Sequence, residues 1–192
     1  MSTEFENFVL IIEILILTAI AVPTVIALFT GAPWVPTPMS RVKKMLELAN
    51  IKPGDRIYDL GCGDGRIVHL AAKDFKADAI GIELSPLVYA MAKVRAFILG
   101  SKSKIIFGDF RGINYSNAKA IVFYLLPKIL RNMRPKFERE LAPGTCVISY
   151  AFEVEGWEPT HIEPVSDGVT SGRIFVYKMP TSIKEKGNEA KK

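Results

Sequence analysis

The first thirty residues differ from the rest of the chain in how apolar and polar positions are distributed. From Phe8 to Phe29 the sequence is almost entirely apolar, and Glu13 is its one charged residue. About twenty-two helical residues at roughly 1.5 Å each span some 33 Å, which is close to the hydrocarbon thickness of a bilayer. We therefore predict a transmembrane helix within residues 1–30, in which Pro23 is tolerated.

The charges that flank this segment predict its orientation. Glu4 and Glu6 precede it, and the first basic residues follow it: Arg41, Lys43, Lys44, Lys52 and Arg56. A cleaved signal peptide needs a positive region ahead of its apolar core, so we favour a retained anchor over a signal peptide, a buried hairpin or an amphipathic segment. The positive-inside rule then places the C-terminal domain on the cytoplasmic face of a membrane.

A proline-rich stretch, residues 31–40, follows the apolar segment. Pro33, Pro36 and Pro38 disfavour a regular helix and favour a stiff, extended connector. Trp34 within it is interpreted either as an aromatic residue at the membrane interface or as part of a lid over a site. We predict a folded domain at residues 41–180 and a disordered polar tail at residues 181–192.

Within the domain, helical and strand patterns alternate. Helices are predicted from Ser40 as N-cap to residue 50, at 65–75, at 86–99 after a Ser85 cap, and at 128–141 with an interruption at Pro135. Short apolar runs predict strands at 56–60, 79–84, 104–107, 120–126, 145–152 and 174–179. This order indicates an α/β fold whose sheet is mostly parallel with helices on both faces. The last strands, which no helix separates, are predicted to be antiparallel.

The candidate chemistry begins in a glycine-rich turn after the first strand, where residues 59–66 read DLGCGDGR. Gly61, Gly63 and Gly65 allow tight turns with positive φ, and they let a ligand approach the backbone closely. In an open α/β sheet such a turn lies at the carboxyl ends of the strands, where ligands bind. A nucleotide-type cofactor is therefore expected.

Charge in this turn discriminates among cofactors. Dinucleotide folds prefer GxGxxG and place a pyrophosphate at the helix N-terminus, whereas here Arg66 stands after the last glycine and Asp64 adds negative charge. A phosphate loop of the GxxxxGK[ST] type does not occur in the sequence. S-adenosylmethionine carries a sulfonium cation and an amino group but no phosphate. We therefore predict S-adenosylmethionine as the cofactor, and no metal.

Three carboxylates follow three successive strands. Asp59 is expected to orient the turn and attract the cationic methionine portion, and Glu83 lies at the spacing of an acid that binds ribose hydroxyls. Asp109 is placed to bond an adenine amino group, with Phe110 beside the ring. The alternatives are a strand-end cap, a solvated charge and a turn residue, respectively. The predicted cofactor site also includes Gly61, Cys62, Gly63, Gly65 and Leu84.

The remaining polar candidates are interpreted as structural. Cys62 is taken as a small residue that fills the turn rather than a nucleophile, and Arg66 as holding the turn or a neighbouring acid. His69 and His161 lack partners at ligand spacing, and Cys62 and Cys146 lack the spacing of a zinc site or a disulfide scaffold. A net charge of +5, much of it in the tail, is weak support for nucleic-acid binding.

DLGCGDGR, together with GIEL at 81–84 and GDF at 108–110, resembles the first motifs of class I methyltransferases, which have a Rossmann-like sheet. A narrower resemblance rests on PWVPTP at 33–38, YLLP at 124–127 and FERELAPGTCVISYAFEVEGWEP at 137–159. These segments are similar to protein-lysine methyltransferases that modify the ATP synthase c-subunit and the adenine nucleotide translocase, and to microbial relatives. The resemblance runs from Pro33 to Met179.

The resemblance implies roles for particular residues. Cofactor residues would be Asp59, Gly61, Gly63, Glu83 and Asp109. The opening for methyl transfer would be bordered by Trp34, Val35, Pro36 and Thr37 and by Tyr124, Leu125 and Pro127. Tyr124 is the catalytic candidate, orienting a lysine amine through its hydroxyl or its ring face.

The resulting hypothesis is a membrane-anchored protein-lysine N-methyltransferase that acts on a membrane or membrane-proximal protein. A methyltransferase for a lipid, a quinone or another small molecule is the alternative, followed by a cofactor-binding adaptor without activity and an NAD-dependent oxidoreductase. The [DN]PP[YF] motif of nucleic-acid amine methyltransferases is replaced by FYLLP, so no nucleic-acid partner is expected. The basic residues between Lys128 and Arg139 are interpreted as a solvated helix face, or as a patch for anionic lipid or an acidic partner.

Overall fold

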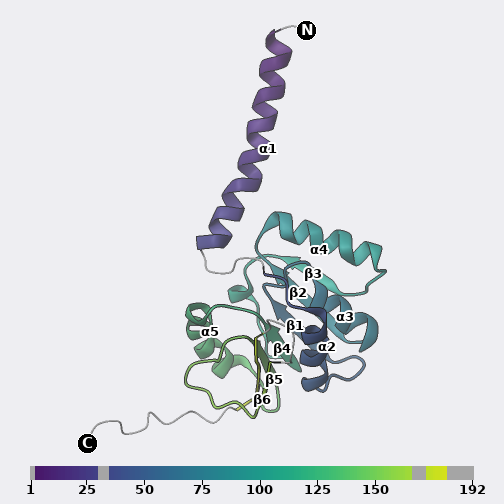
Figure 1. The fold of residues 1–192 in the computed structure, drawn as a ribbon, viewed down its shortest axis with the longest axis vertical. Helices are drawn as coiled ribbons and strands as arrows, with labels where there is room; N and C mark the ends of the chain where they lie inside the picture. Colours follow the sequence, from purple (N-terminus) through teal and green to yellow (C-terminus); the bar gives the residue numbers. More distant parts are fainter. Residues whose placement is uncertain (1–2, 30–34, 166–171, 181–192) are drawn as a thin grey trace, which may run out of the picture.

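The computed structural model describes residues 3–29, 35–165 and 172–180 of the chain. A long helix, α1 (Thr3–Phe29), projects from an α/β domain (Figure 1). Trp34, the rest of residues 31–34 and the predicted tail at 181–192 lie outside the described residues. The predictions made for them therefore stay predictions.

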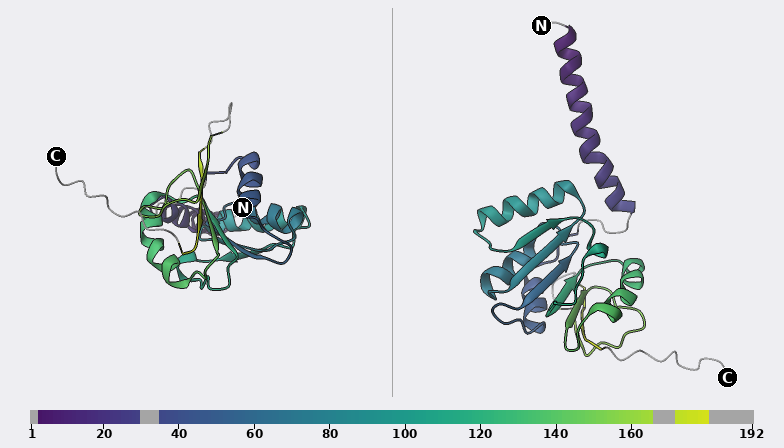
Figure 2. Two further views of the ribbon diagram at one scale, coloured as in Figure 1. Left: turned by 90° about the horizontal axis from the view of Figure 1, so that it is seen from below. Right: turned by 180° about the vertical axis from the view of Figure 1, so that it is seen from behind.

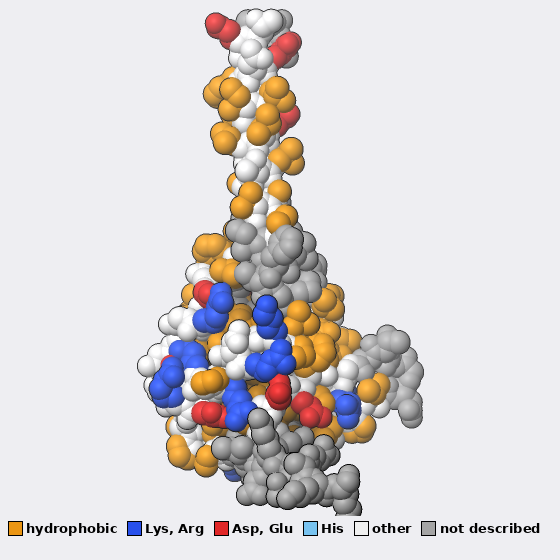
Figure 3. Space-filling view, turned by 90° about the vertical axis from the view of Figure 1, so that its left-hand side faces the viewer, with side chains coloured by type: hydrophobic (Ala, Val, Ile, Leu, Met, Phe, Trp, Pro, Cys, Tyr) orange, Lys and Arg blue, Asp and Glu red, His pale blue; other side chains and the backbone are white. Residues whose placement is uncertain are grey.

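The described side chains of α1 are mostly exposed, and from Phe8 onward most of them are apolar. Leu15 and Leu17 expose 62% and 66% of their surface, and apolar side chains cover the visible side of the helix in Figure 3. Among the residues that the structure describes, no helix is long and apolar enough to cross a membrane. The predicted transmembrane span is thus not supported.

The domain is built on one seven-stranded sheet in the order β3-β2-β1-β4-β5-β7-β6. Five strands run parallel: β1 (Arg56–Leu60), β2 (Asp78–Glu83), β3 (Lys104–Phe107), β4 (Ala120–Phe123) and β5 (Cys146–Tyr150). β7 (Ile174–Lys178) and β6 (His161–Glu163) are antiparallel to their neighbours. The strand order reverses between β1 and β4, so the carboxyl ends of these strands form the topological switch point of the sheet.

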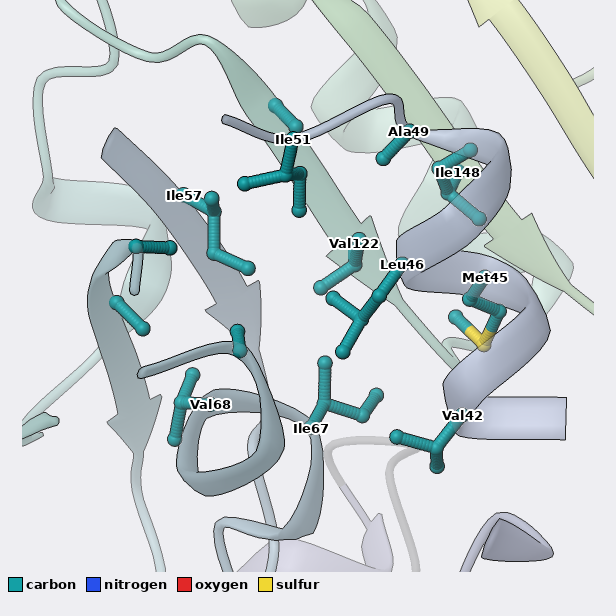
Figure 4. Close-up of a cluster of buried hydrophobic side chains, with 14 of the residues drawn as sticks. Val42, Met45, Leu46, Ala49, Ile51, Ile57, Ile67, Val68, Val122 and Ile148 are labelled. Atoms are coloured by element: carbon teal, nitrogen blue, oxygen red, sulfur yellow. The ribbon is translucent and has the colours of Figure 1, made fainter. Parts of the chain in front are cut away.

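Helices cover both faces of this sheet (Figure 2). One face packs against α2 (Met39–Leu48) and α3 (Arg66–Asp74), which bury an apolar stripe that includes Val42, Leu46 and Val68 (Figure 4). The opposite face packs against α5 (Pro127–Glu140) and against Trp157. α4 (Pro86–Ile98) contacts β2 and β3, and a short 3-10 helix, η1 (Phe110–Gly112), follows β3. The mostly parallel α/β architecture and the antiparallel end of the sheet were both predicted correctly.

Several local predictions were wrong. α2 begins at Met39 with Pro38 at the cap position, rather than with Ser40 as the cap. Ser85 does occupy the N-cap of α4, as predicted, although its side chain forms no capping hydrogen bond. α5 continues through Pro135, because a proline removes one backbone donor without ending a helix whose other side is packed. β6 was not predicted, since its three residues carry no alternating apolar pattern.

Candidate functional site

The glycine-rich turn joins β1 to α3 and is tied to the end of β2. The backbone N–H groups of Gly61 and Cys62 both donate to the carbonyl of Ile82, at 3.0 Å. The N–H of Gly63 donates to Oε2 of Glu83, also at 3.0 Å. Because the N–H groups of these three consecutive residues all bind the end of one neighbouring strand, the path of the turn is fixed at the switch point.

Gly65 is the position where this turn requires glycine. It has a φ of 76° at the N-cap of α3, in the left-handed region that residues with a Cβ rarely adopt. A Cβ at this position would also lie 2.5 Å from Nε2 of His69, which is buried. His69 in turn shares a 2.8 Å hydrogen bond with Ser103 through Nδ1, in agreement with its predicted structural role.

Asp59 lies in β1 and is 2% exposed. Its Oδ2 atom is buried and has no hydrogen-bond partner among the described residues. Burial raises the pKa of this carboxyl well above its usual value, and the nearby charges of Glu83 and Asp64 raise it further. A buried acid without a partner is costly, and a cationic ligand at this point would compensate it.

Glu83 ends β2 with its carboxylate held by backbone donors. Its Oε1 accepts from the N–H of Ser85 at 2.8 Å, while Oε2 accepts from Gly63. Burial raises the pKa of Glu83, and hydrogen bonds from Ser85, Gly63 and Leu84 partly oppose this rise. Leu84 follows directly and is half-buried. The two acids at the ends of β1 and β2 are thus brought to the same turn.

The charge of Asp64 is neutralised within the protein, which corrects one electrostatic expectation. Both of its oxygens accept from Arg66, at 2.9 and 2.8 Å, and Arg95 of α4 forms a second ion pair with it. Burial acts to raise the pKa of Asp64, but these two guanidinium groups outweigh it and the pKa is lowered. Asp64 therefore stabilises the turn, as does Arg66, and it does not present free negative charge to a ligand.

Cys62 fills space beneath the turn, as predicted. Its Sγ would lie only 2.7 Å from a Cβ on Gly81, so the thiol occupies space that is free only because residue 81 of β2 is glycine. Burial raises the pKa of the Cys62 thiol well above its usual value, and the charges of Asp59 and Glu83 add to the effect. A buried thiol with a raised pKa is not a nucleophile at neutral pH.

Asp109 follows β3 and is bound locally. Its oxygens accept from the backbone N–H of Arg111 at 2.9 Å and from Nε of Arg111, and the two side chains form an ion pair. Hydrogen bonding to Arg111 lowers the pKa of Asp109 despite partial burial. Phe110, the first residue of η1, is half-buried beside it. Their predicted contacts with adenine stay a prediction.

An aromatic group stands where β4 and β5 end. Tyr124 follows β4 directly and meets the ring of Tyr150 edge-to-face, with centroids 4.9 Å apart. The ring of Phe152 lies against the same tyrosine with a centroid distance of 6.2 Å. The hydroxyl of Tyr150 accepts from the N–H of Gly172 at 2.9 Å. We call Tyr124, Tyr150 and Phe152 the aromatic group.

Register places the aromatic group next to the buried acid. Asp59 pairs with Val122 on the neighbouring strand β4, so Tyr124 lies two residues further toward the carboxyl end of the sheet. Two residues of strand span about 7 Å. Val122 and Tyr124 belong to the cluster on the α2 and α3 face, as alternation along a strand requires. Asp59, Tyr124 and Tyr150 therefore share one edge and one face, while Phe152, at the same edge, also packs against the cluster on the opposite face.

The connector reaches the same edge. The carbonyl of Thr37 accepts from Nη1 of Arg66 at 2.7 Å, which ties the connector to the first residue of α3. Val35 and Pro36 are exposed just before it. Leu125 is buried, and its Cδ2 lies 3.5 Å from where a Cβ on Gly61 would be. Of the predicted lid residues, Thr37 and Leu125 thus lie at the glycine turn. Pro127 is exposed and begins α5, and the lid role of Val35 and Pro36 stays a prediction.

Sequence reasoning missed three residues of this region. Arg41 of α2 is 3% exposed and donates to the carbonyls of Pro164 and Gly172, at 3.0 and 3.1 Å. Arg95 and Tyr150 were also missed. Tyr150 lies two residues before the end of a predicted strand, as Tyr124 does, and this was an available signal. The long-range partners of the two arginines left no such signal in the sequence.

The arrangement fits a cationic ligand without phosphate. The one buried oxygen without a partner at this edge is an acid, Oδ2 of Asp59, and the donors of the turn at Gly61, Cys62 and Gly63 are already occupied among the described residues. The N–H groups of Gly61, Cys62 and Gly63 therefore do not offer a cradle for phosphate, whereas a sulfonium or ammonium group would compensate the acid.

Comparison with known proteins agrees with this geometry. A family model described as "ANTKMT methyltransferase domain" matches residues 59–161. The chain is 38% identical over 148 residues to a "Protein-lysine N-methyltransferase" of Saccharolobus islandicus, covering 76% of this chain and 92% of that protein. It is 30% identical over 132 residues to the lysine N-methyltransferase of Xenopus laevis that is named for the ATP synthase c-subunit. That match covers 68% of this chain but 58% of the frog protein, so the chain spans less than two thirds of its length.

A solved structure extends the similarity to the fold. It is described as an RNA methyltransferase from Salinibacter ruber in complex with S-adenosyl-L-homocysteine. The TM-score is 0.73 and the sequence identity 35%, with coverage of 79% of this chain and 97% of that chain. The bound molecule is the demethylated form of S-adenosylmethionine.

Proposed function

We propose, from the premise that this chain belongs to the ANTKMT methyltransferase family and is an S-adenosylmethionine-dependent methyltransferase, that its substrate is a lysine side chain of a membrane or membrane-proximal protein. The observation that carries this proposal is the position of the aromatic group at the edge of the sheet. Its Tyr124 lies two residues beyond Val122, the residue of β4 that pairs with Asp59. The names of the two relatives, both lysine N-methyltransferases, support the same substrate class.

The cofactor side of the site is assigned to the glycine turn and its acids. Asp59 would compensate the cationic methionine portion, because its buried Oδ2 lacks a partner among the described residues. Glu83, held rigidly by Gly63 and Ser85, would accept from the ribose hydroxyls. The roles of Gly61, Cys62, Gly65, Leu84, Asp109 and Phe110 in cofactor contact remain part of this proposal.

The substrate side is assigned to the aromatic group and the connector. When bound, the cofactor supplies an electrophilic methyl group for in-line displacement by an uncharged amine. A lysine that enters beside Tyr124 leaves water, and desolvation lowers the pKa of its ammonium group. The ring of Tyr124 attracts the cation before it loses its proton to water, and the same ring face then positions the uncharged amine. Alignment of amine and methyl group is the main contribution required of the protein.

Membrane association is the second part of the proposal. Most described side chains of α1 after Asn7 are apolar and exposed, which is unfavourable in water and favourable in lipid. We infer that α1 holds the domain at a membrane, on the cytoplasmic face that the flanking charges favour. The division into an anchor at 1–30, a connector or lid at 31–40 and a catalytic domain at 41–180 belongs to the same inference.

One labelling experiment tests the substrate. The protein is incubated with cofactor carrying a radiolabelled methyl group and with host membranes and total RNA, which are then separated into protein, lipid and RNA. Label in protein that is recovered as methyllysine after hydrolysis is the expected result, and it should disappear with Glu83→Ala. Label in RNA alone would favour the activity named for the Salinibacter ruber structure. Label in lipid alone would favour the small-molecule alternative, and either result would overturn the lysine proposal.

A further inference from the structure

The helix α4 has an unusually apolar outer face. Five apolar side chains on it are exposed by 39–88% of their surface, with Phe97 at 88% and Ile98 at 74%: Leu87, Met91, Val94, Phe97 and Ile98. Leu87, Met91, Val94 and Ile98 follow one another at intervals of three or four residues, which places them on one side of a helix. A soluble helix normally presents polar side chains at these positions.

The inner face of α4 is fixed to the domain, so the outer face cannot turn inward. Ala92 is fully buried against the sheet. Arg95 forms an ion pair with Asp64 in the glycine turn, and Tyr89 packs against Phe107 with ring centroids 5.5 Å apart. The exposed apolar face is therefore a permanent feature of the folded domain, and it is attached through Arg95 to the candidate active site.

The position of α4 relates this face to α1. α4 lies across the end of the domain from which α1 projects, and α1 rises steeply from that end (Figures 1 and 2). The two helices contact each other. On β3, next to α4, Ile106 and Phe107 expose a further 38% and 53% of their surface. Two exposed apolar elements are thus gathered at one end of the molecule.

The charges around α4 favour lipid as the occupant of this face. Residues 86–107 contain no Asp or Glu, while Lys93 and Lys102 are exposed at or just beyond the helix. An apolar stripe with lysines beside it matches the interfacial region of a bilayer with anionic headgroups. The contact between α1 and α4 favours the same occupant for both helices. When α1 associates with lipid, it brings the neighbouring helix α4 to the lipid surface.

We propose that the outer face of α4 rests on an anionic bilayer, into which it inserts Val94, Phe97 and Ile98. This inference rests on the proposed association of α1 with a membrane and goes beyond it, because it assigns a second contact and an orientation to the domain. Arg95 would then hold the glycine turn at a constant height above the lipid. Lysines close to the bilayer surface, rather than lysines of extended soluble regions, would be the accessible substrates.

The test uses the full-length protein with an environment-sensitive dye on a cysteine introduced by Phe97→Cys. The matched control is Val165→Cys, because Val165 is also an exposed apolar residue but follows β6, at the opposite edge of the sheet from β3. Protein labelled without an added cysteine gives the background from Cys62 and Cys146. Vesicles contain phosphatidylcholine with or without phosphatidylglycerol, and a fraction of the lipids carries a quencher.

The expected result is a blue-shifted emission at position 97 that the lipid quencher reduces by more than half in anionic vesicles, with little change at position 165. Adding Val94→Glu and Ile98→Glu should abolish the shift, while α1 keeps the protein in the floating vesicle fraction. Unshifted emission at position 97 in protein that floats would overturn the inference and leave the anchoring role of α1 intact. Protein that does not float at all would overturn both. A shift that grows with protein concentration without vesicles would assign the face to a second copy and also overturn the inference.

Discussion

The unpaired acid Asp59 makes a prediction that separates stability from function. In the cofactor-free protein this carboxylate is buried, has no partner for Oδ2 among the described residues, and lies near the charges of Glu83 and Asp64. Asp59→Asn keeps the shape of the side chain and removes its charge. We expect this change to stabilise the cofactor-free protein while weakening cofactor binding.

The size of both effects follows from the burial of the Asp59 carboxylate and its lack of a partner among the described residues. Asp59→Asn still buries an unpaired polar atom but removes the charge. An uncompensated buried charge costs more than an unpaired neutral group, which itself costs about 1–3 kcal/mol, so the free energy of unfolding at pH 7 should rise by an amount of that order. For a protein of this size the gain corresponds to roughly 2–12 °C in Tm. Loss of a charge-assisted contact to the cofactor, at about 1.5–3 kcal/mol, should weaken binding roughly 10- to 150-fold.

The effect on stability should depend on pH in a defined direction. The pKa of Asp59 is raised in the folded state, so the group favours folding most below its ordinary pKa of 3.8, and this contribution is lost as the pH rises through the folded value. The variant lacks this dependence. Its advantage over the wild-type protein should therefore be small near pH 4 and grow toward pH 7.

Thermal unfolding without cofactor, measured between pH 4 and pH 7.5, and calorimetric titration with S-adenosylmethionine together check the prediction. Asp64→Asn is the matched control, because Asp64 is a buried carboxylate whose charge is paired with Arg66 and Arg95. That variant should lose stability, since it leaves two guanidinium groups uncompensated. A less stable Asp59→Asn protein, or a gain that does not change with pH, would refute the description of Asp59 as an unpaired buried charge.

Three further predictions concern the neighbouring residues. Glu83→Gln should weaken cofactor binding at least about tenfold in calorimetric titration, because the neutral amide accepts less strongly from the ribose hydroxyls and from the turn; unchanged affinity would place the cofactor elsewhere. If the ring face of Tyr124 holds the substrate, Tyr124→Phe should retain most of kcat/KM and Tyr124→Ala should lose about tenfold or more, and unchanged turnover in both would remove it from the site. Gly65→Ala should lower the free energy of unfolding by about 1–3 kcal/mol, because its φ is positive and its Cβ meets His69, whereas Gly144→Ala, with positive φ but open space, should cost less in the same melting experiment.

Local patterns predicted most of the fold because each element carries its own signal. The strand Arg56–Leu60 and the turn after it were placed correctly from a short apolar run and three glycines. Strand ends were less certain: the strand predicted to reach residue 126 ends at Phe123. Tyr124 therefore stands beyond the strand, in the position of a site residue rather than of a sheet residue.

Partners far apart in sequence were the part that could not be predicted. From the sequence, Asp64 was predicted to add negative charge to the turn. Its ion pair with Arg95 of α4 forms only in the folded chain, so it could not be predicted. Arg41 reads as one of several basic residues after the apolar segment, yet it is buried and bound to two carbonyls more than a hundred residues away. Such contacts depend on tertiary packing, and no local pattern of apolar and polar residues indicates them.

The hydrogen bond between Arg66 and the carbonyl of Thr37 has a practical consequence for shortened versions of this enzyme. Removing the N-terminal helix is the obvious route to a well-behaved preparation, and the start of α2 at Met39 suggests a natural cut. A protein that begins there would lack the Thr37 carbonyl, one of the three oxygens to which the Arg66 side chain donates, so only Asp64 would still hold this arginine. A cut ahead of residue 35 would preserve that restraint.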